Sequence, residues 1–373
     1  MKIIITSNSS WNLINFREEL IDMIIESKHE LYILSPSDEA TKLLLKKNIT
    51  YKKIFLNRNL LSPFSDIILF FQYMYYFIKL KPILILSFTV KANIYSSIAS
   101  KFTNIFHISN ITGLGTHVLK NNFIRIILNF FYKFSLSDNY KIYFHNEDDK
   151  KYFIDNKILI ENNYEVIPGS GINLNFNQYE EYKKFFDDNI SFLYIGRMIK
   201  DKGVVELLES AKIIKREFPK TKFIFVGEID KSNHSSIDNK YFSKFINDNI
   251  IEYMGKVDDV RNFIKNCSCV ILPSYREGLS KSLLESLALG RPIITTNVSG
   301  CKEIVKDNFN GFLCFPKNIN DLSNKIRKFI NLDYKDKLNF SLNTKKLVKN
   351  FDVQIILKSY QEEINKINDK ERL

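Results

Sequence analysis

Short apolar segments alternate with amphipathic helical segments along the chain, and this alternation constrains the fold more than any other sequence feature. The first apolar segment is Lys2–Thr6, a helical pattern covers Asn12–Lys28, and the next apolar segment is Glu30–Ser35. Further strands are predicted at Tyr51–Leu56, Ile83–Phe88, Ile105–Ser109, Lys141–Phe144 and Glu165–Ile167. Strands separated by helices pair in parallel, and helices then cover both faces of the sheet. The pattern predicts an α/β fold.

The alternation stops once and then begins again. Pro168–Asn177 and the charged run to Asp188 are typical of a connection between domains. Strands are then predicted at Ser191–Ile195, Lys222–Val226, Ile250–Met254, Cys269–Leu272, Pro292–Thr296 and Gly311–Phe315. With 373 residues, the chain exceeds the usual size of one core.

We therefore predict two Rossmann-like, doubly wound parallel-sheet domains facing across a cleft. Residues 1–170 form the first domain, 171–190 the linker and 191–350 the second domain. Residues 351–373 form a final helix that packs back towards the first domain. Ligands are expected at the carboxyl ends of the strands, where doubly wound sheets bind them.

The charge balance favours an anionic partner. The 54 Lys and Arg residues outnumber the 42 Asp and Glu residues, for a net charge of +12. Nucleic acid, an acidic membrane surface and phosphorylated substrates would all suit this charge. The cations are spread along the chain, without a zinc-knuckle spacing or an arginine-rich arm. We therefore expect no nucleic-acid partner.

The four cysteines favour a structural role in a reduced, cytoplasmic protein. Cys267 and Cys269 alternate within an apolar run and have no neighbouring His or Cys pair, and Cys301 and Cys314 stand alone. We expect no metal site from them and no disulfide. Phe64–Leu80 is very apolar but is interrupted by Asp66, Gln72 and Lys79, so we interpret it as a buried crossover helix rather than an interfacial one. No transmembrane segment is predicted.

The segment 273–292 is the most informative part of the sequence. A loop follows the predicted strand 269–272, and a helix then runs from Lys281 to Leu289 until Gly290, which suits a left-handed residue after a helix. Glu277 therefore lies on the loop and Glu285 one turn into the helix. Each has a structural alternative, because Ser282 and Glu285 fit a capping box and Glu277 could be a solvated loop acid. Their common location favours a functional pair.

Around Glu277 and Glu285, the second domain resembles glycosyltransferase family 4, a family of retaining enzymes with the GT-B fold. Seven residues separate Glu277 from Glu285, as in the family signature, and the surrounding Leu272–Gly278 and Gly290–Ile293 are similar to the family pattern. Tyr194–Arg197 followed by Lys202 and Gly203 matches its other signature. Shorter similarities occur at Val226–Gly227, Gly255–Val257 and Gly311–Leu313. The resemblance covers the second domain closely and the first more loosely.

The resemblance implies a nucleotide-sugar donor site. Arg197 and Lys202, after Gly196, would neutralise the departing diphosphate, which would make a metal unnecessary; the alternative for Arg197 is a surface ion pair. Glu285 would hold the ribose hydroxyls. The donor sugar and phosphate would contact Glu277 and the backbone N–H groups of the three residues after it, Gly278, Leu279 and Ser280. A separate short segment, Gly255, Lys256 and Val257, would frame the base.

The sequence departs from the family pattern at two places. Leu279–Lys281 follows the Glu-Gly pair, where many relatives carry Phe or Gly. The loop after the first strand, Ser7–Trp11, lacks the glycine pair that is common in the family. The phosphate contact that this loop makes in relatives is therefore an open question.

The first domain is expected to bind the acceptor. Ser9 lies in the loop after the first strand, and Arg17 lies on the following helix. Gly113, Gly115 and His117 belong to a loop after another strand. A plain turn is the alternative for the glycines, and a solvated loop residue is favoured over a proton-handling role for His117.

A basic, aromatic-rich segment, Lys120–Lys133, has helical spacing. It is either a core helix with a basic face or an interfacial helix that rests on an anionic leaflet. Within the family, Gly169–Leu174 and Gly300–Glu303 are similar to bacterial enzymes that extend undecaprenyl-diphosphate-linked sugars, such as α-1,3-N-acetylgalactosaminyltransferases of N-glycan assembly and O-antigen and capsule enzymes.

The sequence and the resemblance together predict a retaining, metal-independent transferase without a cofactor, which moves a hexose or N-acetylhexosamine from a UDP-sugar to a polyprenyl-diphosphate-linked saccharide. The predicted location is peripheral, on the inner face of the bacterial cytoplasmic membrane. Two alternatives remain open. One is a UDP-sugar epimerase of the same fold, and the other is a catalytically silent, membrane-associated partner of a polysaccharide assembly complex.

Overall fold

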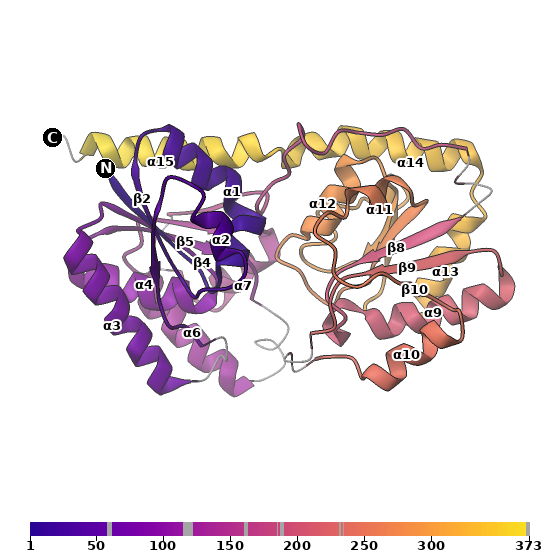
Figure 1. The fold of residues 1–373 in the computed structure, drawn as a ribbon, viewed down its shortest axis with the longest axis horizontal. Helices are drawn as coiled ribbons and strands as arrows, with labels where there is room; N and C mark the ends of the chain where they lie inside the picture. Colours follow the sequence, from indigo (N-terminus) through magenta and orange to yellow (C-terminus); the bar gives the residue numbers. More distant parts are fainter. Residues whose placement is uncertain are drawn as a thin grey trace. The chain divides into compact units, whose positions relative to one another are not determined.

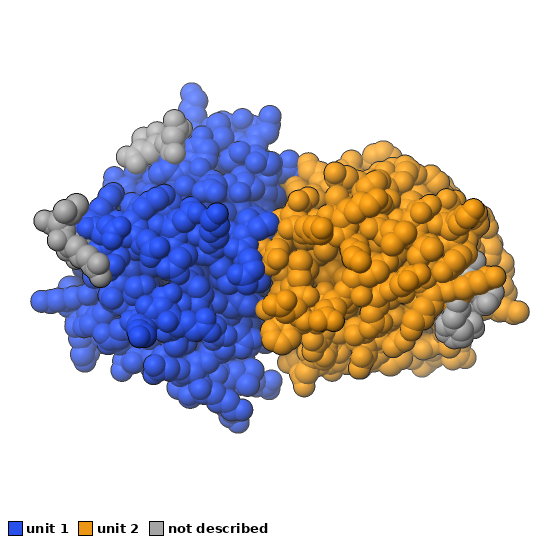
Figure 2. Space-filling model, turned by 90° about the horizontal axis from the view of Figure 1, so that it is seen from above, with its two compact units in different colours: residues 1–170, 353–373 blue, residues 171–352 orange. Residues whose placement is uncertain are grey.

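The computed structural model describes residues 1–57, 62–114, 122–159, 163–184, 186, 190–230, 233 and 235–370. The chain divides into two compact units, coloured separately in Figure 2. Unit 1 contains residues 1–170 and 353–373, and unit 2 contains residues 171–352. Each unit has its own parallel sheet, which agrees with the predicted doubly wound α/β fold.

Unit 1 is built on a seven-stranded sheet of order β3-β2-β1-β4-β5-β6-β7, with parallel neighbours throughout. The order reverses between β1 and β4, which pair through Ile3–Leu84 and Thr6–Ser87. The strands are β1 (Lys2–Thr6), β2 (Glu30–Ser35), β3 (Thr50–Lys53), β4 (Leu84–Phe88), β5 (Phe106–Ile111), β6 (Lys141–Phe144) and β7 (Tyr164–Val166).

Helices cover both faces of this sheet because its strands are apolar on both sides. Ile3 and Ile5 pack with α1 (Ser10–Glu26) and α15 (Val353–Lys370), whereas Ile4 packs towards α3 (Pro63–Leu80). Figure 1 shows α1 and α15 on one side of the sheet and α3, α4 and α6 on the other. The remaining helices are α2 (Thr41–Leu44), α4 (Val90–Thr103), α6 (Asn122–Leu136) and α7 (Glu147–Asp155).

Helix α15 completes the core of unit 1 although it ends the described chain. Ile356, Ile364 and Ile367 are buried with residues of α1 and the sheet. Burial of an aliphatic side chain of this size contributes about 1.5–3 kcal/mol. The Tyr360 hydroxyl donates a hydrogen bond to Asn110 Oδ1, and the ring of Tyr360 packs edge-on against that of Tyr143 with centroids 5.1 Å apart.

Unit 2 repeats the architecture with six parallel strands in the order β10-β9-β8-β11-β12-β13. They are β8 (Ser191–Ile195), β9 (Lys222–Val226), β10 (Glu252–Tyr253), β11 (Cys269–Leu272), β12 (Ile293–Thr296) and β13 (Gly311–Cys314). The helices are η1 (Lys200–Lys202), α9 (Val204–Glu217), α10 (Asn239–Asn247), α11 (Arg261–Lys265), α12 (Lys281–Ala288), α13 (Ile319–Ile330), α14 (Tyr334–Leu347) and η2 (Val348–Phe351).

Cys267 and Cys269 are buried, as their alternation within an apolar run predicted, and Cys301 and Cys314 are buried too. Helix α3 connects β3 to β4, but the prediction that this apolar segment is buried is wrong for its outer face, where Phe64 is 80% exposed and Phe71 63% exposed. Among the described residues, no helix is long and apolar enough to cross a bilayer.

Candidate functional site

The predicted donor residues gather at the carboxyl end of the unit 2 sheet. Its strand order reverses between β8 and β11, and loops on either side of such a point separate and leave room for a ligand. The loop after β8 carries Arg197 and Lys202, and the loop after β11 carries Glu277. The fold therefore brings together residues that are far apart in the sequence.

Arg197 lies at the exposed edge of this site. Its side chain is 47% exposed, and Nη1 forms an ion pair of 2.9 Å with Asp230. The backbone is fixed beneath it, because the buried Tyr194 hydroxyl donates a 2.8 Å hydrogen bond to the Arg197 carbonyl. Burial, with Glu277 nearby, raises the pKa of Tyr194 well above its usual value, so this hydroxyl keeps its proton. The surface ion pair considered from the sequence is thus present.

The loops after β8 and β11 are in direct contact. Gly203 has φ +71°, and a Cβ there would lie 2.0 Å from the Pro273 carbonyl oxygen, so only glycine fits. The Asp201 carbonyl accepts a hydrogen bond from the Tyr275 N–H at 2.9 Å. The Tyr275 hydroxyl in turn donates to Glu206 at 2.6 Å. These contacts hold the loop after β8 and the loop after β11 in a fixed arrangement.

Lys202 and Glu277 form a salt bridge at this contact. Their side chains are 23% and 11% exposed, so both are partly withdrawn from water. The backbone of Glu277 is held by a third loop, since its N–H donates to the Ser299 carbonyl at 2.9 Å. The interpretation of Glu277 as a fully solvated loop acid is therefore wrong.

The segment after Glu277 is also anchored to the loop after β12. The Ser280 N–H donates to the Gly300 carbonyl at 3.1 Å, so this N–H would reach a phosphate only by giving up that bond. Gly278 and Leu279 lie between these two anchored positions and are partly buried. The expected contact of all three N–H groups with the donor stays a prediction.

Glu285 lies on α12, one turn in, as predicted. The capping box is wrong, because the helix begins two residues earlier than that motif requires: Ser280 is the N-cap residue, and its side chain makes no capping bond. Gly290 follows the helix with φ +78°, as its left-handed position requires. Glu285 has a side chain only 17% exposed, 4.0 Å from Lys281. Burial raises the pKa of Glu285 above its usual value.

Gly255, Lys256 and Val257 follow β10 at the same end of the sheet. Gly255 has φ +69° and open space where a Cβ would stand, and its carbonyl accepts a 2.8 Å bond from the Gly227 N–H. Lys256 is exposed, while Val257 packs against the unit 2 core. This backbone can line a flat ligand without a side chain in the way.

Three of the acceptor residues predicted in unit 1, Ser9, Arg17 and Gly113, lie towards the carboxyl end of its own sheet. Ser9 is the N-cap of α1, where its hydroxyl accepts from the Asn12 N–H at 3.1 Å. Gly113 follows β5. Gly115 and His117 lie outside the described residues. Lys120, at the start of the predicted basic helix, lies outside them too, and α6 begins at Asn122.

Arg17 is the most unusual residue of this group. Its side chain is 4% exposed, its guanidinium lies 4.4 Å from the centre of the Phe88 ring, and Nη2 is 3.1 Å from His145 Nε2. Its Nε is buried without a hydrogen-bond partner. Burial lowers the pKa of Arg17. Burial of His145, together with the neighbouring Arg17 charge, holds the pKa of His145 well below its usual value. His145 is therefore neutral at physiological pH.

Three residues at these sites were missed from the sequence. Asp230, which pairs with Arg197, lies 33 residues further along the chain in a loop after β9, without a recognisable motif. His145 follows β6 and was hidden by its apolar neighbours. Thr89 follows β4 with φ +80°, and its buried hydroxyl has no partner. Polar residues directly after predicted strands would have identified the last two.

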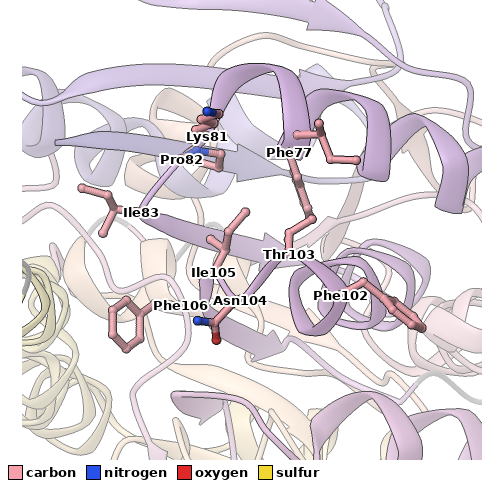
Figure 3. Close-up of a pocket in the computed structure, with 10 residues that line it drawn as sticks. Phe77, Lys81, Pro82, Ile83, Phe102, Thr103, Asn104, Ile105 and Phe106 are labelled. Atoms are coloured by element: carbon pink, nitrogen blue, oxygen red, sulfur yellow. The ribbon is translucent and has the colours of Figure 1, made fainter.

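A surface hollow lies elsewhere in unit 1. It has a volume of about 490 Å³ and lies at the amino ends of β4 and β5, where Ile83 and Phe106 line it together with Phe77, Phe102 and Lys81 (Figure 3). Doubly wound sheets bind ligands at the opposite, carboxyl end. We therefore do not assign the hollow to donor or acceptor. Among the described residues, no group of three or more His, Cys, Asp or Glu side chains could hold a metal ion.

The sequence is similar to proteins of known class. The profile of the family "Glycosyl transferases group 1" matches residues 175–347. The N,N'-diacetylbacillosaminyl-diphospho-undecaprenol alpha-1,3-N-acetylgalactosaminyltransferase of Campylobacter jejuni is 30% identical over 376 residues, covering 96% of this chain and 97% of that protein. The capsular polysaccharide biosynthesis glycosyltransferase CapM of Staphylococcus aureus is 30% identical, over 79% of this chain and 80% of CapM.

Solved structures share the two-domain GT-B fold at lower sequence identity. Anabaena HepE in complex with UDP and glucose is 18% identical, with a TM-score of 0.79 over 98% of this chain and 100% of HepE. Sucrose-phosphate synthase from Thermosynechococcus elongatus is 15% identical, with a TM-score of 0.81 over 99% of this chain and 100% of that protein. At these identities the likeness establishes the fold alone.

Proposed function

Because the chain belongs to the group 1 glycosyl transferase family, we propose that it transfers a hexose or N-acetylhexosamine from a UDP-sugar to a polyprenyl-diphosphate-linked saccharide in bacterial glycan or surface polysaccharide biosynthesis. The Campylobacter relative acts, by its name, on a diphospho-undecaprenol-linked sugar, and the Staphylococcus relative serves capsule biosynthesis. The observation that carries the proposal is the placement of Arg197, Lys202 and Glu277 at the switch point of unit 2.

Arg197 and Lys202 would bind the donor diphosphate. Both cations lie in the loop at the carboxyl end of β8, and each is paired with a carboxylate, Asp230 for Arg197 and Glu277 for Lys202. A diphosphate would compete for them with two negative charges and several acceptor oxygens. Two cations on the leaving group would stabilise the developing charge, a contribution of several kcal/mol. We propose that this makes a metal ion unnecessary.

The two glutamates would hold the donor's hydroxyl groups. Glu285 is partly buried on the first turns of α12 and would accept hydrogen bonds from the ribose. Once a diphosphate draws Lys202 away, Glu277 would be free to accept from the sugar hydroxyls, helped by the backbone of Gly278–Ser280. The segment 255–257 would frame the uracil ring. All of these residues belong to unit 2, so the proposed donor site is contained within one compact unit.

The proposed reaction retains the anomeric configuration, so the new bond is α. The bond between the sugar C1 and the diphosphate oxygen breaks, and the acceptor hydroxyl forms the new bond to C1 on the same face. Its proton passes to the departing diphosphate oxygen. Arg197 and Lys202 hold that oxygen's charge, which is the role their placement suits. An inverted anomeric signal in the product NMR spectrum would contradict this mechanism.

The acceptor would bind at the carboxyl end of the unit 1 sheet. Arg17 offers a buried guanidinium with an unsatisfied Nε, and Ser9 stands at the amino end of α1. A cation and a helix amino terminus both favour phosphate oxygens. A polyprenyl acceptor would bring the protein to the inner face of the bacterial cytoplasmic membrane as a peripheral protein, with an anionic surface beside it.

The test is UDP release from a panel of UDP-sugars in EDTA, with and without lipid-linked saccharides extracted from bacterial membranes. We expect acceptor-dependent release from one donor. Release without acceptor, with the UDP-sugar converted to an isomer, would instead indicate an epimerase. Tight lipid binding with no turnover of any donor would indicate a silent assembly partner. Loss of activity in EDTA, restored by a divalent cation, would contradict metal independence.

A further inference from the structure

Helix α3 presents an apolar outer face to solvent. Its exposed side chains recur every three or four residues and so form one stripe along the helix. Their exposed fractions range from 37% for Ile68 to 80% for Phe64. The stripe consists of Phe64, Ile67, Ile68, Phe71, Tyr75 and Ile78. A helix on the surface of an ordinary soluble protein carries polar residues at these positions.

Helix α6 repeats the feature. Phe123, Ile126, Phe130 and Phe134 are each more than half exposed and follow one another at helical spacing. The opposite face is apolar as well, because Leu128 and Tyr132 are buried in the unit 1 core. A helix that is apolar on both sides belongs in a core or at a membrane, and one side of α6 has no core to face.

The two stripes belong to one layer of unit 1. Helix α4 lies between α3 and α6, as Figure 1 shows. Ring contacts join them, with centroids 6.1 Å apart for Phe70 and Phe102 and 6.3 Å apart for Tyr95 and Phe131. Phe102, near the end of α4, is itself 68% exposed. We call these exposed side chains of α3 and α6, with Phe102, the apolar platform.

The segment that carries the platform is rich in cations and poor in acids. Between Ser62 and Asp138 the sequence has seven Lys and Arg residues and two acidic residues, Asp66 and Asp138. Asp138 is exposed and pairs with Lys101 at 3.0 Å. Asp66 is buried and forms a salt bridge with Lys91, so it adds no negative charge to the surface. Lys79, Lys81 and Lys133 are exposed. The hollow in Figure 3 adjoins this surface, since Ile78, Phe102 and Lys81 line it.

The apolar platform and its neighbouring cations together favour one kind of binding partner. Aromatic and aliphatic side chains with surrounding lysines match the acyl boundary and the phosphates of an anionic bilayer. A second copy of the chain is a poorer match, because a symmetric contact through this surface would place like-charged rims against each other. We propose that the platform docks the protein on an anionic membrane, with its outer aromatic side chains inserted at the interface.

The biological need for this surface rests on the proposed lipid-linked acceptor, but the docking itself can be measured without donor or acceptor. The full chain is sedimented with vesicles of phosphatidylethanolamine and phosphatidylglycerol, and with vesicles of phosphatidylcholine alone. We expect strong partition onto the anionic vesicles and weak partition onto the neutral ones. Lys79→Glu with Lys133→Glu should reduce binding to the anionic vesicles by about tenfold or more.

The apolar contribution is tested with Phe71→Ser combined with Phe130→Ser. Both side chains point away from the core, so folding should be unaffected, and partition should fall by about tenfold at every salt concentration. Phe315→Ser is the matched control, because Phe315 is 66% exposed but lies in unit 2. The control should bind vesicles as the wild type does.

Two results would overturn the proposal. One is unchanged partition of the platform variants. The other is a wild-type dimer that the Phe71/Phe130 variant abolishes while vesicle binding persists, which would make this surface a contact between copies. To separate the proposal from the transferase assignment, turnover is also measured with a short-chain, water-soluble diphosphate saccharide. Platform variants should keep that activity and lose it only with a long-chain acceptor embedded in vesicles.

Discussion

Lys202 and Glu277 form a salt bridge although they are 75 residues apart in the sequence, because their loops follow neighbouring strands at the switch point of unit 2. The bridge pairs two opposite charges at the centre of the proposed donor site. Donor binding must therefore exchange this pair for two new ones, Lys202 with phosphate and Glu277 with the sugar. The predictions on the donor side follow from this exchange.

Removal of either cation should disable turnover. Arg197→Ala and Lys202→Ala should each lower kcat by about a hundredfold or more, as expected when one group that stabilises transition-state charge is removed. Thermal unfolding should shift little, since partly exposed ion pairs contribute about 1 kcal/mol or less. Lys200→Ala, an exposed lysine of the same turn, is the control and should retain wild-type kcat. Normal turnover of the first two variants would reject the diphosphate role.

Replacing Gly300 should impair the donor site as strongly as replacing the charged residues. It has φ +76°, and a Cβ there would lie 2.6 Å from the backbone and Cβ of Glu277. Gly300→Ala should displace the Glu277 loop and weaken UDP-sugar affinity by about tenfold or more, measured by calorimetry. Gly290→Ala is matched in strain, with φ +78°, but meets Glu180 and Tyr179 at the far end of α12. It should lose stability while UDP-sugar affinity is kept; equal affinities for the two variants would count against the proposed site.

Glu285 should make donor binding sensitive to mild acid. Burial raises its pKa, so Glu285 takes up a proton at a higher pH than an ordinary glutamate and then loses the charge that would hold the ribose. The donor KM should rise as pH falls through this raised value. Glu285→Gln should raise the KM at neutral pH and flatten the profile, whereas an unchanged KM would leave Glu285 without a role in donor binding.

The same shift has a stability consequence of definite sign. A carboxyl whose pKa is higher in the folded state than in the unfolded state favours folding when protonated, and that contribution is lost as pH rises through the folded-state pKa. Glu285→Gln should therefore raise Tm at neutral pH, and the difference from wild type should shrink on acidification. A lower Tm at neutral pH would show that other contacts of Glu285 outweigh its burial.

Arg17 should matter for the acceptor more than for folding. It is a buried cation with an unsatisfied Nε, and such a group is a weak source of stability. Arg17→Met should keep Tm within a few degrees and raise the acceptor KM about tenfold, with the donor KM unchanged. A large loss of Tm with normal acceptor kinetics would make Arg17 a structural residue.

Local sequence patterns predicted much of the donor loop and helix. The apolar run 269–272, the loop after it and Gly290 identified a strand, a turn and a helix end because each depends on neighbouring residues only. The same local reasoning wrongly suggested Ser282 as the N-cap of the helix. Serines at 280 and 282 both suit a helix start, and only the fold selects the first. Asp230 could not be foreseen, because its pairing with Arg197 depends on how two loops meet.

Helix α3 shows a different limit. Its apolar character was evident, but composition does not tell whether an apolar face meets protein or solvent. The sequence suggested burial because apolar helices in α/β proteins usually cover sheets. One face of α3 does so through Leu69, Tyr73 and Phe77, and the other does not. That second face is the one on which the proposed membrane contact depends.

The return of α15 to unit 1 has a consequence for synthesis on the ribosome. Residues 1–170 leave the exit tunnel first, yet their core lacks Ile356, Tyr360 and Ile364 until all of unit 2 has followed. Unit 2 is one continuous segment, residues 171–352, so it can fold before unit 1 is complete. The amino-terminal half of this nascent chain is therefore the second to mature.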